Sequence, residues 1–172
     1  YHIIRPAERG GGTHFAHQGI AHDELPEETR ERWSRLSSVN SASGVVHPLV
    51  HTHPLTGRRC IWLHLGMTGA IIEKLPEGEG FRLLDADEMT EVCHSYNDIL
   101  NAGLENGYAT PFEYRQNDCV FIDNLAVAHR AAPEAHMPAE QQGLRIMHRS
   151  TTRGTPPLAP GFGLPQHVGI DA

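Results

Sequence analysis

The strongest chemical pattern in the sequence lies near its C-terminal end, where two arginines flank a short strand-like run. Arg145, Met147 and Arg149 stand two positions apart. Side chains two apart point to the same face of a β-strand, so both guanidinium groups would reach one side of a sheet. Because arginine pairs bidentately with carboxylates, a small dicarboxylate or sulfonate would be a suitable ligand. Spacing alone leaves open the alternative that both arginines pair with surface Asp or Glu.

Histidine supplies the second pattern. His129 follows the turn Asp123–Asn124 and a short apolar run. A neutral imidazole at the mouth of a barrel can bind a metal, although a structural role is the alternative for any single histidine. His51 and His53 have a His-x-His spacing that metal sites also use. Pro54 follows at once, so turn and packing roles are favoured for this pair.

Composition excludes several classes of protein. The 172 residues include 14 Lys and Arg against 21 Asp and Glu, for a net charge of -7. This balance argues against a nucleic-acid partner, which requires a basic surface. No apolar run is long enough for a membrane helix. Three distant cysteines without a C-x-x-C pair indicate reduced thiols and a cytoplasmic location. The 13 histidines are dispersed, which disfavours a histidine-rich metal-buffering protein.

The surrounding pattern predicts short strands and two helices, typical of a β-sandwich or barrel with helical insertions. Asp85 and Glu88 form a capping-box pattern at the start of the second helix. Strands are expected over residues 2–5, 13–19, 44–50, 60–65, 108–114, 119–122, 126–131 and 144–152, helices over 25–36 and 85–103, and a loop over 66–80. One domain would span residues 1–153, and an extended Pro-rich tail would follow over 154–172.

Four motifs, in order, resemble a known family. They are Gly11-Gly12-Thr13, the segment from His47 to Arg58, Phe121-Ile122-Asp123-Asn124 with His129-Arg130, and Arg145-Ile146-Met147-His148-Arg149. Each motif is weak alone, but the order and spacing resemble the taurine dioxygenase family. That family comprises iron(II)- and 2-oxoglutarate-dependent oxygenases and includes 2,4-dichlorophenoxyacetate dioxygenase. The resemblance runs from about Gly10 to Gly154.

The resemblance implies a mainly β fold with helical insertions, a double-stranded β-helix (jelly-roll), whose iron is bound by two histidines and a carboxylate. His129 matches the distal histidine ligand, and Arg145 and Thr13 match the residues that hold the far carboxylate of 2-oxoglutarate. Arg149 matches an arginine near the iron-bound end of 2-oxoglutarate or near an anionic substrate group. The implied cofactors are Fe(II), 2-oxoglutarate and O2. The implied reaction hydroxylates an unactivated C–H bond of a small-molecule substrate and releases succinate and CO2.

The sequence departs from the family in three places. The His-x-Asp pair expected before Gly11 is not in the chain, so the resemblance implies that the N-terminal part of the fold is missing. His-x-Gly or His-x-Ala there would instead indicate a halogenase. His51 stands where the family usually has arginine. The His129–Arg145 gap is long, and we expect its loop over 134–143, with residues 65–80, to form the substrate rim.

Two further questions stay open at the level of sequence. A fold of the same ancestry could bind a small carboxylate without turnover, as a non-catalytic binding module. Self-association into a homo-oligomer is also compatible with the sequence.

Overall fold

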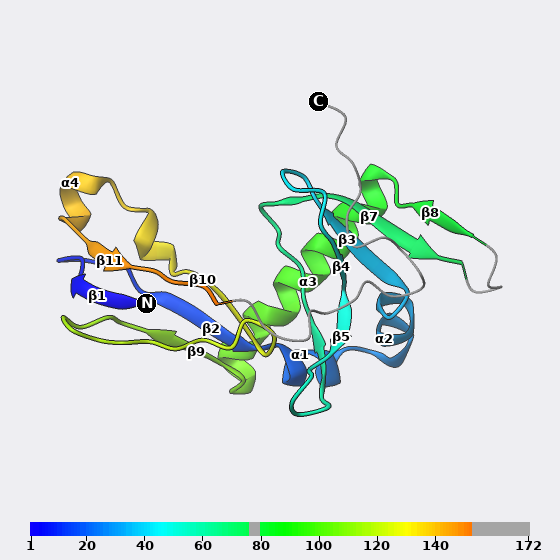
Figure 1. The fold of residues 1–172 in the computed structure, drawn as a ribbon, viewed down its shortest axis with the longest axis horizontal. Helices are drawn as coiled ribbons and strands as arrows, with labels where there is room; N and C mark the ends of the chain where they lie inside the picture. The colour runs from blue at the N-terminus through cyan, green and yellow to red at the C-terminus, as the bar shows by residue number, and fades with distance from the viewer. Residues whose placement is uncertain (76–79, 153–172) are drawn as a thin grey trace.

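The chain forms two lobes in a computed structural model that describes residues 1–75 and 80–152 (Figure 1). We call residues 1–17 and 109–149 the site lobe, and residues 18–75 and 80–108 the core lobe. The strands of the site lobe are β1 (His2–Arg5), β2 (Thr13–His17), β9 (Ala109–Phe112), β10 (Val127–Ala131) and β11 (Ile146–His148). The short helices η1 (Pro133–His136) and α4 (Ala139–Gln142) lie between β10 and β11.

The core lobe carries the remaining elements. Its strands are β3 (Leu36–Asn40), β4 (Val46–Pro48), β5 (Val50–Thr52), β6 (Arg59–Ile61), β7 (Thr68–Lys74) and β8 (Phe81–Leu83). Its helices are α1 (Gln18–Glu24), α2 (Glu27–Trp33) and α3 (Ala86–Asn106). Helix α3 runs from the core lobe toward the strands of the site lobe and packs on β9 (Figure 1).

The sheets of the site lobe are antiparallel and small. One has the order β10-β2-β9, and the other pairs β1 with β11. In the first sheet His129 pairs with Phe15, and Ala131 pairs with Thr13. Because side chains alternate along a strand, His129 and Thr13 lie on one face of this sheet. His14 and Arg130 lie on the other face.

The core lobe contains the main hydrophobic core. Its four-stranded sheet has the order β4-β3-β7-β8, and the hairpin β5-β6 lies beside it. Leu36, Leu49, Ile61 and Ile71 are completely buried. Aromatic residues from helices and loops complete the cluster: Trp33, Tyr96 and Tyr108. Burial of these side chains is the dominant stabilising term for the lobe.

Helix boundaries follow local capping signals. His17 Nδ1 accepts hydrogen bonds from the amides of Gly19 and Ile20 and begins α1 directly after β2. The capping box of Asp85 and Glu88 begins α3 as the sequence predicts. The helix predicted over 85–103 is therefore confirmed and runs three residues further, to Asn106.

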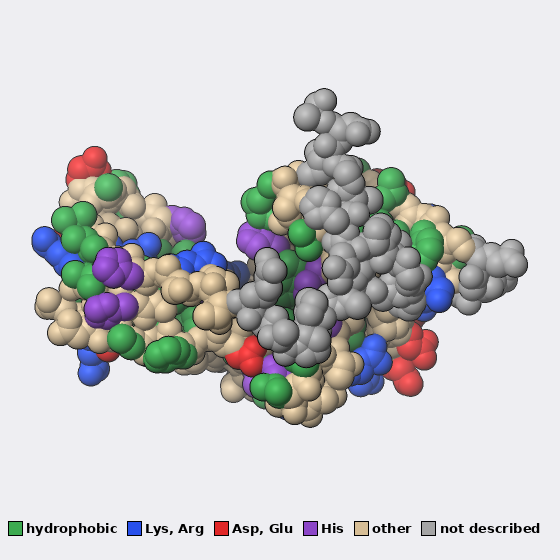
Figure 2. All heavy atoms as spheres, in the orientation of Figure 1, with side chains coloured by type: hydrophobic (Ala, Val, Ile, Leu, Met, Phe, Trp, Pro, Cys, Tyr) green, Lys and Arg blue, Asp and Glu red, His purple; other side chains and the backbone are tan. Residues whose placement is uncertain are grey.

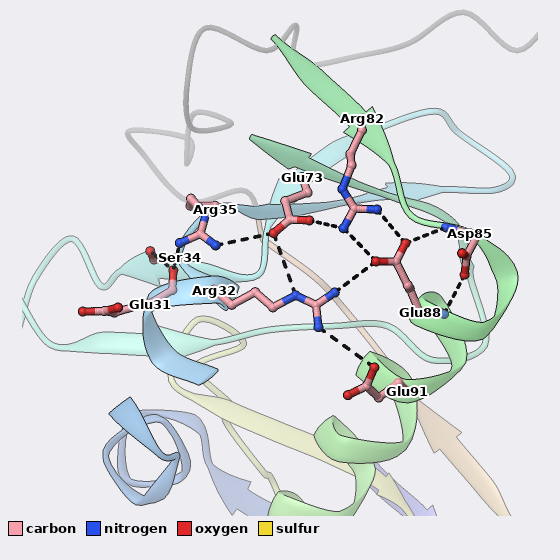
Figure 3. A network of polar contacts seen from close by, with 9 residues as sticks. All are labelled: Glu31, Arg32, Ser34, Arg35, Glu73, Arg82, Asp85, Glu88 and Glu91. Carbon is pink, nitrogen blue, oxygen red and sulfur yellow. Dashed lines mark hydrogen bonds and ion pairs between the residues drawn. The ribbon is translucent and has the colours of Figure 1, made fainter. Parts of the chain in front are cut away.

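An ion-pair network links α2, β7, β8 and α3 in the core lobe (Figure 3). The Glu73 side chain is 7% exposed, and its Oε2 lies 2.5 Å from an Arg82 nitrogen. Arg35 lies 3.5 Å from the other oxygen of Glu73. Arg82 also contacts both oxygens of Glu88 at 2.7 Å, and these bonds lower the pKa of Glu88 to about 2. The network therefore ties the sheet edge to the first turn of α3.

Several predicted boundaries of the secondary structure are wrong, including the end of the strand predicted over 13–19, since α1 begins at Gln18. Residues 68–74 form β7 instead of loop, because Ile71 and Ile72 pair with β3 and Gly69 allows Ser41 to approach closely. The helix predicted over 25–36 covers only α2, since Leu36 begins β3. The strand predicted over 119–122 is also wrong. Cys119 makes one isolated bridge to His2 of β1, and Phe121 is 95% exposed, so the pairing does not continue along the apolar run.

The prediction of a mainly β fold with helical insertions is confirmed at that level. All three cysteines are free thiols. Within residues 1–75 and 80–152, no helix is long and apolar enough to cross a membrane. The predicted tail over 154–172 lies outside the described residues.

Candidate functional site

His129 lies on β10 and points toward the first residue of the chain. Its Nε2 is 3.1 Å from the Tyr1 hydroxyl, and the two rings meet edge to face. The Arg149 guanidinium lies 5.8 Å from the centre of the Tyr1 ring. Burial lowers the pKa of His129, and the charges of Arg149 and His64 lower it further. The neutral imidazole that binds metals is therefore favoured.

Arg145 contacts the glycine turn that leads into β2, two residues before Thr13. Arg145 Nη1 donates to the Gly11 carbonyl at 3.2 Å, and Gly11 has a φ of 80°. A side chain at Gly11 would also collide with Ala7, because its Cβ would lie 2.8 Å from that residue. The Tyr114 hydroxyl donates to Thr13 Oγ1 at 2.8 Å. The Thr13 hydrogen is then available to an acceptor, and the exposed Arg145 side chain provides further N–H donors.

The four predicted site residues thus form two pairs. Thr13 and Arg145 lie at the beginning of β2, while His129 and Arg149 both lie near Tyr1. Thr13 and His129 share one face of the β10-β2-β9 sheet. Sequence spacing predicted that Arg145 and Arg149 share one face of a strand. In the structure these two arginines directly flank β11, which pairs with β1.

A cavity of about 490 Å³ lies between the lobes. Only two of the four predicted residues, His129 and Arg149, line it. The other walls come from α3 and from the segment after β6, and include Trp62, His64, Tyr96, Asn97, Leu100 and Leu104. Leu65 and Gly66 of the predicted substrate rim also line the cavity, whereas none of residues 134–143 does.

The hairpin histidines have a different position from His129. His51 Nε2 lies 2.8 Å from the Leu125 carbonyl, and His53 Nε2 lies 2.8 Å from Asp123 Oδ2. Both rings therefore contact the turn before β10. The sequence favoured turn and packing roles for this pair, but it gave no sign of which distant turn the rings would contact.

The described residues do not provide a complete metal site. Within residues 1–75 and 80–152, no three His, Cys, Asp or Glu side chains are grouped so that they could hold a metal ion. His129 would offer one nitrogen, and metal binding at Nε2 requires the Tyr1 hydroxyl to give up its contact. His22 and Asp23, which are adjacent in the sequence, contact each other, and Asp23 also forms an ion pair with Arg58 at 2.6 Å. Figure 2 shows histidine side chains scattered over both lobes.

Comparison with known proteins assigns the chain to a family. Residues 2–151 match the model of the family described as taurine catabolism dioxygenase TauD, TfdA family. This match covers most of the chain, and the protein therefore belongs to the TauD/TfdA family. The resemblance inferred from the four motifs is confirmed.

Individual relatives share a modest identity with the chain. An alpha-ketoglutarate-dependent sulfate ester dioxygenase of Pseudomonas putida is 25% identical over an alignment 183 positions long, which covers 91% of this chain and 54% of that protein. A Schizosaccharomyces pombe protein, provisionally named an alpha-ketoglutarate-dependent sulfonate dioxygenase, is 27% identical over 157 residues. That match covers 81% of this chain and 37% of the relative. The chain therefore spans about half or less of the length of these curated relatives.

Solved structures show the same fold. The structure of AAD-2 in complex with Mn(II) and N-oxalylglycine superposes with a TM-score of 0.65 at 20% identity, over 84% of this chain and 57% of AAD-2. At this identity the likeness concerns the fold alone. It supports the mainly β architecture seen in the two lobes.

Proposed function

We propose that this chain forms the cosubstrate-binding part of an Fe(II)- and 2-oxoglutarate-dependent dioxygenase with a jelly-roll fold. The proposed reaction hydroxylates an unactivated C–H bond of a small molecule and releases succinate and CO2. The observation that carries the proposal is the contact of Arg145 with the Gly11 carbonyl, two residues before Thr13, which shares a sheet face with His129. The names of the relatives, which refer to alpha-ketoglutarate (2-oxoglutarate), support the same cosubstrate.

Each residue of the proposed site has a chemical task that suits its surroundings. The Arg145 fork would pair with the far carboxylate of 2-oxoglutarate, and the Thr13 hydroxyl would donate to it. Arg149 would face an anionic group near His129, because it lines the same cavity. Iron, 2-oxoglutarate and O2 are the proposed cofactors, and His129 is the one metal ligand that we assign within the described residues.

Binding of 2-oxoglutarate tests the proposal directly. We expect titration calorimetry to show binding by the parent chain and at least a tenfold weaker Kd for Arg145→Ala, since a hydrogen-bonded charge contributes about 1.5–3 kcal/mol. Arg115→Ala is a matched control, because Arg115 is also exposed in the site lobe. Equal loss of binding in both variants, or no loss in Arg145→Ala, would contradict the assignment.

Turnover separates the dioxygenase from a non-catalytic carboxylate-binding module. Sulfonates and sulfate esters are the first substrates to try, because the relatives' names refer to them. In a protein that supplies the other two iron ligands to this chain, we expect succinate release with Fe(II), O2 and such a substrate, and His129→Ala should abolish it. Binding of 2-oxoglutarate without succinate release under any condition would favour the binding module.

The remaining proposals concern the cellular location, the partners and the oligomeric state of the protein. We propose a cytoplasmic location and a small-molecule partner, with no nucleic-acid or membrane partner, on the basis of net charge and cysteine usage. Size-exclusion chromatography with light scattering would test whether the chain forms a homo-oligomer.

A further inference from the structure

His51 and His53 connect the β5-β6 hairpin to the turn that precedes β10. Their Nε2 atoms lie 2.8 Å from the Leu125 carbonyl and 2.8 Å from Asp123 Oδ2, respectively. The partners are 74 and 70 positions apart in the chain. Both side chains are buried, with 5% and 4% of their surface exposed. A hairpin of the core lobe therefore contacts the turn that leads to His129.

Hydrogen-bond partners determine the proton position on each ring. His53 Nδ1 lies 3.3 Å and 3.2 Å from the amides of Leu55 and Thr56, which can only donate. The Nδ1 atom of His53 is therefore an acceptor, and the protonated Nε2 donates a hydrogen bond to Asp123. The Leu125 carbonyl can only accept, so Nε2 of His51 is also a donor. The two histidines thus present two directed N–H groups to one turn.

Hydrogen bonds of Asp123 connect the turn to the first residue of β10. Asp123 Oδ1 accepts from the Leu125 amide at 2.9 Å, and the Asp123 carbonyl accepts from the Val127 amide at 2.9 Å. Val127 begins β10, and His129 is two residues further on the same face. Movement of Asp123 would therefore move Val127, the first residue of the strand that carries His129.

We propose that His51 and His53 are positioning residues that fix the turn over residues 123–127 and, through β10, the direction of the His129 imidazole. The inference rests on the proposed function only where it gives His129 a role as metal ligand. The family resemblance places an arginine at position 51, so the His51 contact is a feature of this chain. Removal of a group that hydrogen-bonds directly to a metal ligand typically changes metal affinity about 10–100-fold. His51 and His53 act through the turn, so we expect a change of up to about tenfold.

The test measures the His129 ring itself, in the full chain and without metal. Histidine ring resonances in a long-range proton–nitrogen NMR spectrum can be assigned with His129→Gln. We expect His53→Leu and His51→Leu to shift and broaden the His129 signals. His53→Gln should keep them near the parent positions, because a glutamine amide can donate from the place of Nε2. His94→Leu, at an exposed histidine of α3, is the control and should leave them unchanged.

A second variant keeps the test valid if His53→Leu does not fold. Asp123→Ser preserves an oxygen for the Leu125 amide but is too short to reach His53. We expect this variant to move the His129 signals in the same direction. Unchanged His129 signals in folded variants at positions 51, 53 and 123 would overturn the positioning role.

Metal titration distinguishes failure of this inference from failure of the proposed function. In the presence of 2-oxoglutarate, we expect the Kd for Mn(II) to rise by up to about tenfold in His53→Leu and to recover in His53→Gln. A parent chain that binds neither Mn(II) nor 2-oxoglutarate, but whose His129 signals respond to position 53, would keep the positioning role and overturn the proposed function. Normal binding of Mn(II) and 2-oxoglutarate, with His129 signals that do not respond to position 53, would keep the proposed function and overturn the positioning role.

Discussion

The two lobes differ in what holds them together. The core lobe buries a continuous cluster that includes Leu36, Leu49 and Ile71, and the Glu73 network links α2, β7, β8 and α3 of the same lobe (Figure 3). Among the described residues of the site lobe, the buried apolar side chains are Ile3, Ala16 and Ala132. Directed polar contacts position the site lobe instead, including those of Arg145 with Gly11 and of His53 with Asp123.

This difference assigns a separate task to each lobe. A packed core resists change because interior side chains are as closely packed as molecular crystals. A lobe with few buried side chains opens at a lower free energy, which suits a region that must admit ligands. We therefore expect the core lobe to supply most of the stability and the site lobe to supply most of the chemistry.

Truncation of one isoleucine in each lobe gives the largest expected contrast. Ile71→Ala removes a completely buried side chain and should lower the free energy of unfolding by about 2–5 kcal/mol. Ile146→Ala, at a residue of β11 that is 40% exposed, should cost less than about 1 kcal/mol. Urea unfolding followed by circular dichroism measures both values. Equal losses would show that the site lobe is as tightly packed as the core lobe.

Acid should weaken the core lobe through His47. Burial lowers the pKa of His47 from 6.5 to about 4. The folded protein keeps this ring neutral while the unfolded chain takes up a proton, so stability falls as the pH drops from about 6.5 to about 4. At 1.4 kcal/mol per pKa unit, the loss approaches about 3 kcal/mol and then levels off. Urea midpoints from pH 7 to pH 4 should show this slope, and His47→Gln should flatten it.

The smallest contrast concerns the ion-pair network of the core lobe. Glu73→Gln leaves Arg35 and Arg82 without a buried carboxylate partner and should cost about 2 kcal/mol. Glu91→Gln is the matched control, because its side chain is 68% exposed and its contact with Arg32 is 4.0 Å long. We expect that control to change stability by less than about 0.5 kcal/mol. If Glu91→Gln lowered the free energy of unfolding as much as Glu73→Gln, burial of Glu73 would not explain the stabilisation by the network.

Sequence reasoning succeeded where the signal is local. The capping box at Asp85 and Glu88 marks the start of α3, and the apolar run before His129 marks β10. Sequence reasoning failed where pairing with a distant segment determines whether residues form a strand. Residues 68–74 resemble a glycine-rich loop until β3 pairs with them, and residues 119–122 resemble a strand although the described residues offer them only one isolated bridge.

The sequence by itself determined the family, the mainly β class, and the identity of Thr13, His129, Arg145 and Arg149 as candidates, because residue type and order carry that information. Only the tertiary structure decided how they group. Arg145 bonds to the carbonyl of Gly11, two residues before Thr13, and the pairing of β1 with β11 brings Arg149 to Tyr1. The structure also gave His51 and His53 a shared target 70 or more positions away. Contacts at such separations depend on the packing of whole elements, which no local pattern encodes.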